Sequence, residues 1–271
     1  MPFINVRDLK MYYEIRGKGP RLLVISGTGG DLRRFPSIFE MPIAQHFEIL
    51  AYDQRGLGQT SKPDIPCTMV DYAEDANALL DAVGWDCCLV MGISFGGMVA
   101  QEFALRYPHR VERLVLACTS SGGAGGSSYP LHELADLPVE DYARHILQLR
   151  DIRRHGIWRA ADPVQFQAMF DEVLTSLQVG VDEPGRQIGF RRQLEARARH
   201  DTYDSLKKLQ MPVYICGGLY DGIAKPSNLR AMQEQIPGSR LDLYEGGHLF
   251  YVQDPRAFER IGAFLNGDLK D

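Results

Sequence analysis

The chain has 271 residues, of which 45% are hydrophobic and 24% charged, values that are ordinary for globular proteins and that exclude a disordered or fibrous chain. The formal net charge is −5, so the chain has no basic field to hold phosphates, and we expect no nucleic-acid partner. No apolar run approaches the roughly 18 residues that cross a bilayer, and residues 1–10 lack the pattern of a signal peptide. We therefore predict a cytoplasmic protein without a membrane partner. The oligomeric state stays open.

The five cysteines are too few and too scattered for a disulfide framework, which agrees with a reducing compartment. We interpret them as small core residues. A catalytic thiol would need a partner base and an activating turn, and the residues that follow Cys118 show neither. The five cysteines are Cys67, Cys87, Cys88, Cys118 and Cys216.

Short apolar runs alternate with helical stretches along most of the chain. Residues 3–6 and 11–15 are typical of a hairpin, and the run 21–26 is apolar on both faces, as in a strand buried in a parallel sheet. Further predicted strands are 47–53, 87–93, 111–118, 213–217 and 240–244. The predicted helices between them are 70–83, 95–107, 227–235 and 255–265. This order predicts an α/β fold, with a parallel sheet covered by helices on both faces.

Residues 122–205 interrupt this alternation. The segment opens with the glycine- and serine-rich stretch 122–128 and shows no convincing strand. Its predicted helices are 139–154, 163–177 and 186–200. We therefore divide the chain into a core domain, residues 1–121 and 206–271, and an inserted helical cap, residues 122–205, which could move as a lid.

Two groups of side chains in the predicted cap have alternative interpretations. Four apolar residues could line an acyl pocket or pack only within the cap: Trp158, Phe166, Met169 and Phe170. Four arginines on one predicted helix could form a solvated face, or one of them could bind a carboxylate: Arg191, Arg192, Arg197 and Arg199.

The clearest chemical motif is residues 92–97, a G-x-S-x-G pattern between a predicted strand and a predicted helix. Glycines permit the sharp turn that holds the central serine in a strained conformation. The hydroxyl of Ser94 would then project at the carboxyl end of the sheet. We predict that Ser94 is a nucleophile.

A serine nucleophile needs a base, and the base needs an orienting acid. His248 follows the last predicted strand in Gly-Gly-His, and Asp221 directly follows the strand 213–217. The order serine, acid, histidine is the one expected for this motif. Asp53 also ends a strand, but we expect it to form a structural ion pair with Arg55.

Acyl transfer further requires donors for an oxyanion. We predict the backbone N–H groups of Phe95, directly after the nucleophile, and of Thr28, in the glycine-rich turn 26–30. That turn is not a phosphate-binding loop, because it completes neither G-x-G-x-x-G nor a Gly-Lys-Ser/Thr sequence.

Together these residues resemble the α/β-hydrolases, in the group of carboxylesterases, 3-oxoadipate enol-lactonases and meta-cleavage-product hydrolases. Residues 53–61 match the family's loop beginning Asp-x-Arg-Gly-x-Gly, and 107–111 match its Tyr-Pro-x-Arg-Val. The resemblance covers about 1–121 and 206–266. It implies an eight-stranded, mostly parallel sheet with a helical cap over the active site. It also implies that Ser94, Asp221 and His248 are the catalytic residues.

We predict a serine hydrolase that cleaves small or medium-sized carboxylic esters or lactones, with no cofactor or metal. Carbon–carbon bond hydrolysis by the same residues, a thioesterase or lipase-like specificity, and a non-enzymatic receptor on the same fold are the alternatives. Serine at position 94, in place of aspartate, disfavours dehalogenation.

Overall fold

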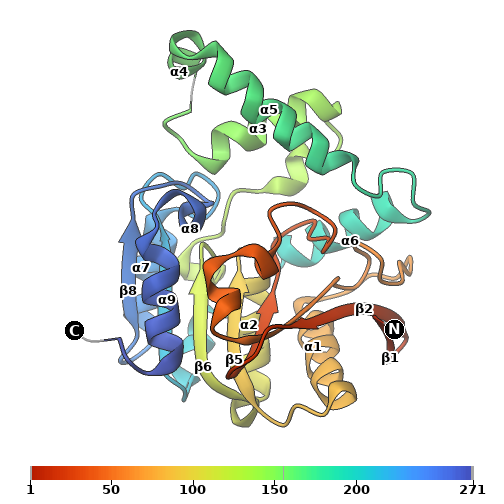
Figure 1. Ribbon diagram of the computed structural model, residues 1–271, viewed down its shortest axis with the longest axis vertical. Coiled ribbons are helices and arrows are strands. Elements are labelled where there is room, and N and C mark those ends of the chain that lie inside the picture. The colour runs from red at the N-terminus through yellow and green to blue at the C-terminus, as the bar shows by residue number, and fades with distance from the viewer. Residues whose placement is uncertain (1, 155, 270–271) are drawn as a thin grey trace.

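A computed structural model describes residues 2–154 and 156–269, except for the side chains of residues 157 and 158. Its centre is an eight-stranded sheet in the order β1-β2-β4-β3-β5-β6-β7-β8, in which the pairs β1–β2 and β2–β4 are antiparallel and the other pairs are parallel (Figure 1). The strands are β1 (Phe3–Val6), β2 (Leu9–Arg16), β3 (Arg21–Ile25), β4 (Glu48–Tyr52), β5 (Cys88–Ile93), β6 (Val111–Ala117), β7 (Val213–Gly218) and β8 (Arg240–Tyr244). The prediction of a mostly parallel α/β sheet is confirmed.

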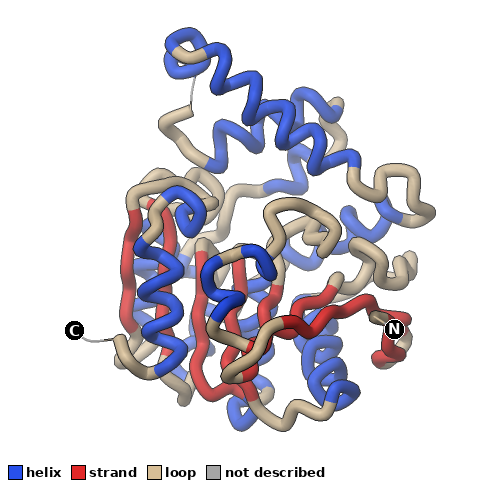
Figure 2. The backbone as a smooth tube through the Cα atoms, viewed as in Figure 1, coloured by secondary structure: helices blue, strands red, loops and turns tan. Residues whose placement is uncertain are grey.

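The central strands are apolar along their whole length because both faces of the sheet are buried. In β3, Leu23 and Ile25 join the core on one face, whereas Leu22 and Val24 join the core on the other. Helices α1 (Met69–Val83), α2 (Phe95–Arg106) and α7 (Pro226–Gln235) cover the first face. Helices α8 (Phe250–Gln253) and α9 (Arg256–Asn266) cover the second (Figure 2).

Local sequence explains where α1 begins and ends. The side chain of Thr68 accepts a hydrogen bond from the backbone N–H of Asp71, whose own side chain accepts one from the N–H of Thr68. At the other end Gly84 takes a left-handed conformation, with φ of 72°. Both signals lie in the sequence, which is why the predicted helix 70–83 differs from the observed one by one residue.

The cysteines only partly match the prediction of core residues. Cys88, Cys118 and Cys216 are buried, and burial raises the pKa of all three thiols. Cys67 is only partly buried and Cys87 is exposed, because Cys87 precedes the first residue of β5 and is not yet covered by a helix.

Between β6 and β7 the chain leaves the sheet and forms α3 (Val139–Arg150), α4 (Gly156–Ala161), α5 (Pro163–Gln178) and α6 (Arg186–Ala198). These helices lie beyond one end of the sheet, at the top and right of Figure 1. The two ends of the segment meet, because Gly122 forms an isolated bridge with Asp201 and the N–H of Thr202 donates to the carbonyl of Ser121 at 2.8 Å. In the described part of the chain, no helix is long and apolar enough to cross a membrane.

Candidate active site

Ser94 occupies the turn between β5 and α2, with φ of 56° and ψ of −115°. A positive φ is uncommon for a residue with a side chain, and it costs free energy that the surrounding packing must offset. The turn depends on glycine at both sides. A Cβ atom on Gly96 would lie 2.0 Å from the carbonyl oxygen of Ile25, and one on Gly92 would lie 2.4 Å from that of Gly96.

The three predicted side chains form one hydrogen-bonded chain. His248 Nε2 lies 3.0 Å from Ser94 Oγ, and His248 Nδ1 lies 2.7 Å from Asp221 Oδ2. All three residues are buried, with 8% of Ser94, 8% of His248 and 2% of Asp221 exposed. A proton on Nδ1 would face the carboxylate, which leaves Nε2 free to accept the hydroxyl proton.

Backbone N–H groups fix the orientation of Asp221. Its second oxygen, Oδ1, accepts hydrogen bonds from the N–H of Ile223 at 2.7 Å and of Ala224 at 3.0 Å. Because these two bonds hold one oxygen, the other is held toward His248.

The end of α3 contacts both loops that carry the acid and the histidine. The N–H of His248 donates to the carbonyl of Arg150, and the N–H of Gly222 donates to the carbonyl of Leu149 at 2.9 Å. A Cβ atom on Gly247 would lie 1.9 Å from the same Arg150 oxygen, so this contact requires glycine. The inserted segment is therefore anchored directly beside His248.

The turn after β3 lies against Ser94. A Cβ atom on Gly27 would be 3.4 Å from Ser94 Cβ and 3.9 Å from its Oγ. Among the described residues, the backbone N–H groups of Thr28 and Phe95 donate to no acceptor. Two free donors beside the serine hydroxyl are the arrangement that an oxyanion requires.

Asp53 has a different position from the one predicted. Its Oδ1 accepts a hydrogen bond from the N–H of Leu32 at 2.7 Å, and its Oδ2 accepts one from the N–H of Gln59 at 2.8 Å. Burial raises the pKa of Asp53 to about 6, and these two N–H groups oppose the rise. The carboxylate thus holds the loop that follows the turn of Thr28.

The predicted ion pair between Asp53 and Arg55 is wrong. Arg55 pairs with the buried Asp75 at 2.8 Å and with Asp8 at 2.8 Å. Strand β4 ends at Tyr52 and the chain turns at residues 55 and 56, so Arg55 is directed toward β1–β2 and α1 while Asp53 faces the turn after β3.

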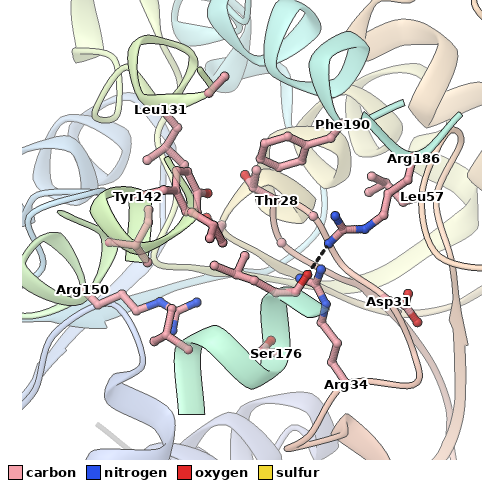
Figure 3. A pocket seen from close by; sticks show the side chains of 18 of the residues that line it. Thr28, Asp31, Arg34, Leu57, Leu131, Tyr142, Arg150, Ser176, Arg186 and Phe190 are labelled. Atoms are coloured by element: carbon pink, nitrogen blue, oxygen red, sulfur yellow. Dashed lines mark hydrogen bonds between the residues drawn. The ribbon is translucent and has the colours of Figure 1, made fainter. Parts of the chain in front are cut away.

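Ser94 and His248 line a cavity of about 580 Å³ between the sheet edge and the inserted helices. Figure 3 shows labelled side chains from both parts around it, among them Thr28 from the turn after β3, Tyr142 from α3 and Phe190 from α6. The apolar wall also includes Leu131, Ile146, Val173, Leu177 and Ile223. Within the described residues, no group of three or more His, Cys, Asp or Glu side chains could hold a metal ion.

The side chains predicted for the acyl pocket do not match this wall. Phe166, Met169 and Phe170 lie in the cluster between α3 and α5 and are absent from the cavity lining. They occupy the face of α5 that packs against α3, a distinction that helical periodicity alone cannot make. The side chain of Trp158 lies outside the described residues.

The four arginines of the predicted helix are engaged elsewhere or exposed. Arg191, at the rim of the cavity, lies 3.6 Å from Asp136, and Arg192 pairs with Asp64 at 2.7 Å. Arg197 is buried and donates to Ser128 Oγ at 2.7 Å. Arg199 is exposed.

Sequence reasoning missed three arginines that do line the cavity: Arg34, Arg150 and Arg186. Arg34 lies a few residues after the predicted strand 21–26. This position in the sequence could have predicted that Arg34 lies at the carboxyl edge of the sheet, near the cavity. Arg150 ends a helix of the inserted segment, and only the packing of that helix against the loop of His248 brings it to the site.

Comparison with known proteins agrees with this fold. Residues 20–144 match the family model described as the alpha/beta hydrolase fold. A protein of Azorhizobium caulinodans named "Putative carbamate hydrolase RutD" is 33% identical, over 96% of this chain and 96% of the relative. The chain belongs to the alpha/beta hydrolase fold family.

Two further relatives bear on this assignment. The 3-oxoadipate enol-lactonase 2 of Acinetobacter baylyi is 25% identical over 94% of this chain and 92% of its own length. The crystal structure of an enol-lactonase from Burkholderia xenovorans LB400 shares the fold with a TM-score of 0.79 at 20% identity. That match covers 98% of this chain and 100% of the other.

Proposed function

We propose that this protein is a serine hydrolase that cleaves carboxylic esters or lactones of small to medium size. The observation that carries the proposal is the hydrogen-bonded chain from Ser94 to His248 to Asp221 at the cavity wall. Hydrolases among the relatives, including an enol-lactonase, support the same reaction class.

In the first half of the reaction, Ser94 Oγ attacks the carbonyl carbon of the substrate while His248 Nε2 takes the hydroxyl proton. The carbonyl π electrons move to the oxygen, and the N–H groups of Thr28 and Phe95 stabilise the negative charge that develops there. Asp221 stabilises the imidazolium that forms. The bond to the leaving oxygen then breaks, and His248 returns the proton to that oxygen.

In the second half, water attacks the acyl group on Ser94 and His248 takes a proton from the water. The second tetrahedral intermediate uses the same two N–H donors. Breaking the bond to Ser94 Oγ releases the carboxylic acid, and His248 returns the proton to the serine. With a lactone, the leaving hydroxyl stays attached to the acyl chain, so one product is released.

We also propose that residues 122–205 act as a cap that completes the substrate cavity. Tyr142, Val173 and Phe190 of this segment face the same cavity as Ser94. Such a cap would exclude water from the reacting carbonyl and provide apolar surface to the acyl chain.

A fluorophosphonate probe tests the nucleophile. We expect one covalent adduct, located on Ser94 by peptide mass spectrometry, and loss of both labelling and aryl ester hydrolysis in Ser94→Ala. Ser176→Ala is a matched control. Ser176 lines the same cavity, but among the described residues it forms no hydrogen bond with a histidine, as Ser94 does. An adduct on another residue, or full ester hydrolysis by Ser94→Ala, would refute the proposal.

A further inference from the structure

Arg34 and Arg150 reach the cavity from two sides. Arg34 belongs to the loop after β3, and Arg150 is the last residue of α3. Figure 3 shows both side chains directed toward the middle of the cavity that Ser94 and His248 also line. Two positive charges therefore face the space that a substrate would occupy.

Among the described residues, neither guanidinium group has a hydrogen-bond or ion-pair partner. None of the hydrogen bonds or ion pairs of the described residues involves the side chain of Arg34 or Arg150, and Arg34 Nε is buried without an acceptor. Burial lowers the pKa of both groups. The charge of Arg186 lowers the pKa of Arg34 further, and the charge of Asp31 opposes this shift. Both residues are partly buried, and removing a cation from water without a partner for it is costly, so proteins seldom keep one without a use.

None of the described acidic side chains around the cavity forms an ion pair with Arg34 or Arg150, and each of these acids already has another cationic partner. Asp31 lies 2.7 Å from Arg33, and Asp136 lies 3.6 Å from Arg191. The third acid, Glu183, contacts Arg33 and Lys62.

Other arginines that are buried or partly buried have partners for their guanidinium groups. Arg55 pairs with two carboxylates, and Arg197 donates to Ser128 and to the carbonyl of Tyr129. Arg186, which also lines the cavity, donates to the carbonyl of Leu177 at 2.8 Å (Figure 3). The lack of partners at Arg34 and Arg150 is therefore a local property of the cavity.

We propose that the cavity binds an ester or lactone that carries a carboxylate, and that Arg34 and Arg150 bind that carboxylate. This inference rests on the proposed hydrolytic function and specifies its substrate class. A guanidinium presents planar N–H groups that match the two oxygens of a carboxylate, and the bound anion would supply the charge that the cavity lacks.

The position of Arg150 gives this contact a role in orienting the substrate. Its carbonyl accepts the N–H of His248, so the backbone from which its side chain extends is fixed relative to the base. A carboxylate bound there would place the scissile carbonyl of a substrate of suitable length beside Ser94. Arg34 and Arg150 would thus act as specificity-determining residues.

A pair of matched esters tests the proposal. 4-Nitrophenyl hydrogen adipate carries a free carboxylate, whereas 4-nitrophenyl methyl adipate carries the same chain with that charge masked. We expect kcat/KM to favour the anionic ester in the native protein. Arg34→Gln and Arg150→Gln should each lower the ratio of anionic to neutral kcat/KM by about 10- to 100-fold, the effect expected for loss of a charged hydrogen-bond pair.

Arg144→Gln is the control for the loss of one positive charge. Arg144 lies on the same helix as Arg150 but pairs with Glu140 and Asp141, so the ratio should stay near the native value. Thermal unfolding of each variant separates loss of the anion contact from loss of the fold. A native ratio near one, or a ratio unchanged in both Arg34→Gln and Arg150→Gln, would overturn the inference.

Binding of adipate to Ser94→Ala, measured by calorimetry, distinguishes this inference from the proposed function. Adipate binding that weakens at least about tenfold in the Arg34→Gln and Arg150→Gln backgrounds supports the anion site even if neither ester is hydrolysed. If the native protein hydrolyses the neutral ester but Ser94→Ala does not bind adipate, the hydrolytic function stands and the anion site is wrong.

Discussion

Asp221 and Asp53 are two buried carboxylates at the same edge of the sheet, and their surroundings give them different tasks. Asp221 directs one oxygen to His248, whereas Asp53 gives both oxygens to backbone N–H groups. Only a carboxylate in contact with the histidine can stabilise the imidazolium. Asp53 instead holds the loop beyond the turn that carries Thr28.

Asp221→Asn should therefore act on the chemical step. An amide in place of the carboxylate favours the wrong tautomer of His248 and cannot stabilise its charged form. We expect kcat for an aryl ester to fall by about 10⁴-fold, as in the serine protease precedent, with little change in the far-ultraviolet circular dichroism.

Asp53→Asn is the matched comparison, because it makes the same substitution at the other buried acid. The amide retains one acceptor oxygen, so either the Leu32 or the Gln59 N–H loses its partner. We expect the free energy of unfolding to fall by about 1–3 kcal/mol in urea titrations. The fall in kcat should be far smaller than in Asp221→Asn; the reverse order would mean that Asp53 orients the base.

At the scale of elements, α6 crosses over the turn of Thr28. Gln193 on this helix accepts the N–H of Gly29 at 2.8 Å, and the ring of Phe190 lies against the same glycine. Helix α5 instead buries Phe166 against α3. Phe190 and Phe166 thus face different surroundings: Phe190 faces the cavity, and Phe166 faces the interior of the inserted segment.

Phe190→Leu should change substrate preference. A smaller side chain at the cavity wall leaves room for a longer acyl chain, and each buried methylene contributes about 0.8 kcal/mol, or roughly fourfold in kcat/KM. In a series of neutral 4-nitrophenyl esters, we expect the optimum to move to longer acyl chains.

Phe166→Leu is the control, because the same change is made away from the cavity. This variant should lose free energy of unfolding while it keeps the native order of chain lengths. A shifted order in Phe166→Leu with an unchanged order in Phe190→Leu would show that the cavity wall is misassigned.

At the scale of the whole molecule, the junction between the inserted segment and the sheet contains a buried titratable group. His200 is 6% exposed and adjoins Asp201, which bridges to Gly122 at the start of the segment. Burial lowers the pKa of His200 to about 4. The folded protein therefore keeps this imidazole neutral at pH values where the unfolded chain binds a proton.

This shift predicts a loss of stability in acid. The pKa of an unperturbed histidine is about 6.5. Between about pH 6.5 and about pH 4, the unfolded state therefore binds more protons than the folded state. The free energy of unfolding should fall as the pH falls through this interval, by up to about 3 kcal/mol from this group alone. Urea titrations across the interval measure the slope.

His200→Gln isolates the contribution of the histidine. The raised pKa of Asp53 changes the free energy of unfolding in the opposite direction. The fold disfavours the charged carboxylate, so this group lowers the free energy of unfolding as the pH rises toward about 6. That effect is common to both proteins and cancels in their difference. Relative to the native protein, His200→Gln should therefore gain free energy of unfolding as the pH falls. A difference between the two proteins that does not change with pH would contradict the assignment.

Much of the site follows from sequence because its causes are local. The glycines at 92 and 96 and the apolar run before Ser94 determine a strand, a tight turn and a helix within a few residues. Asp221 and His248 follow other strands of the same parallel sheet. Because parallel strands end at a common edge, their order in the chain was enough to predict that these three residues meet.

The partners of charged side chains and the lining of the cavity were decided by tertiary structure. Arg55 pairs with Asp75 across the fold and not with its near neighbour Asp53. Phe166 and Phe190 lie on two helices of the same inserted segment, and only packing determines which one faces the cavity. Arg34 and Arg150 come together in one candidate anion site only because α3 packs against the loop of His248. Sequence periodicity specifies which face of a helix is apolar, but it does not specify which part of the protein packs against that face.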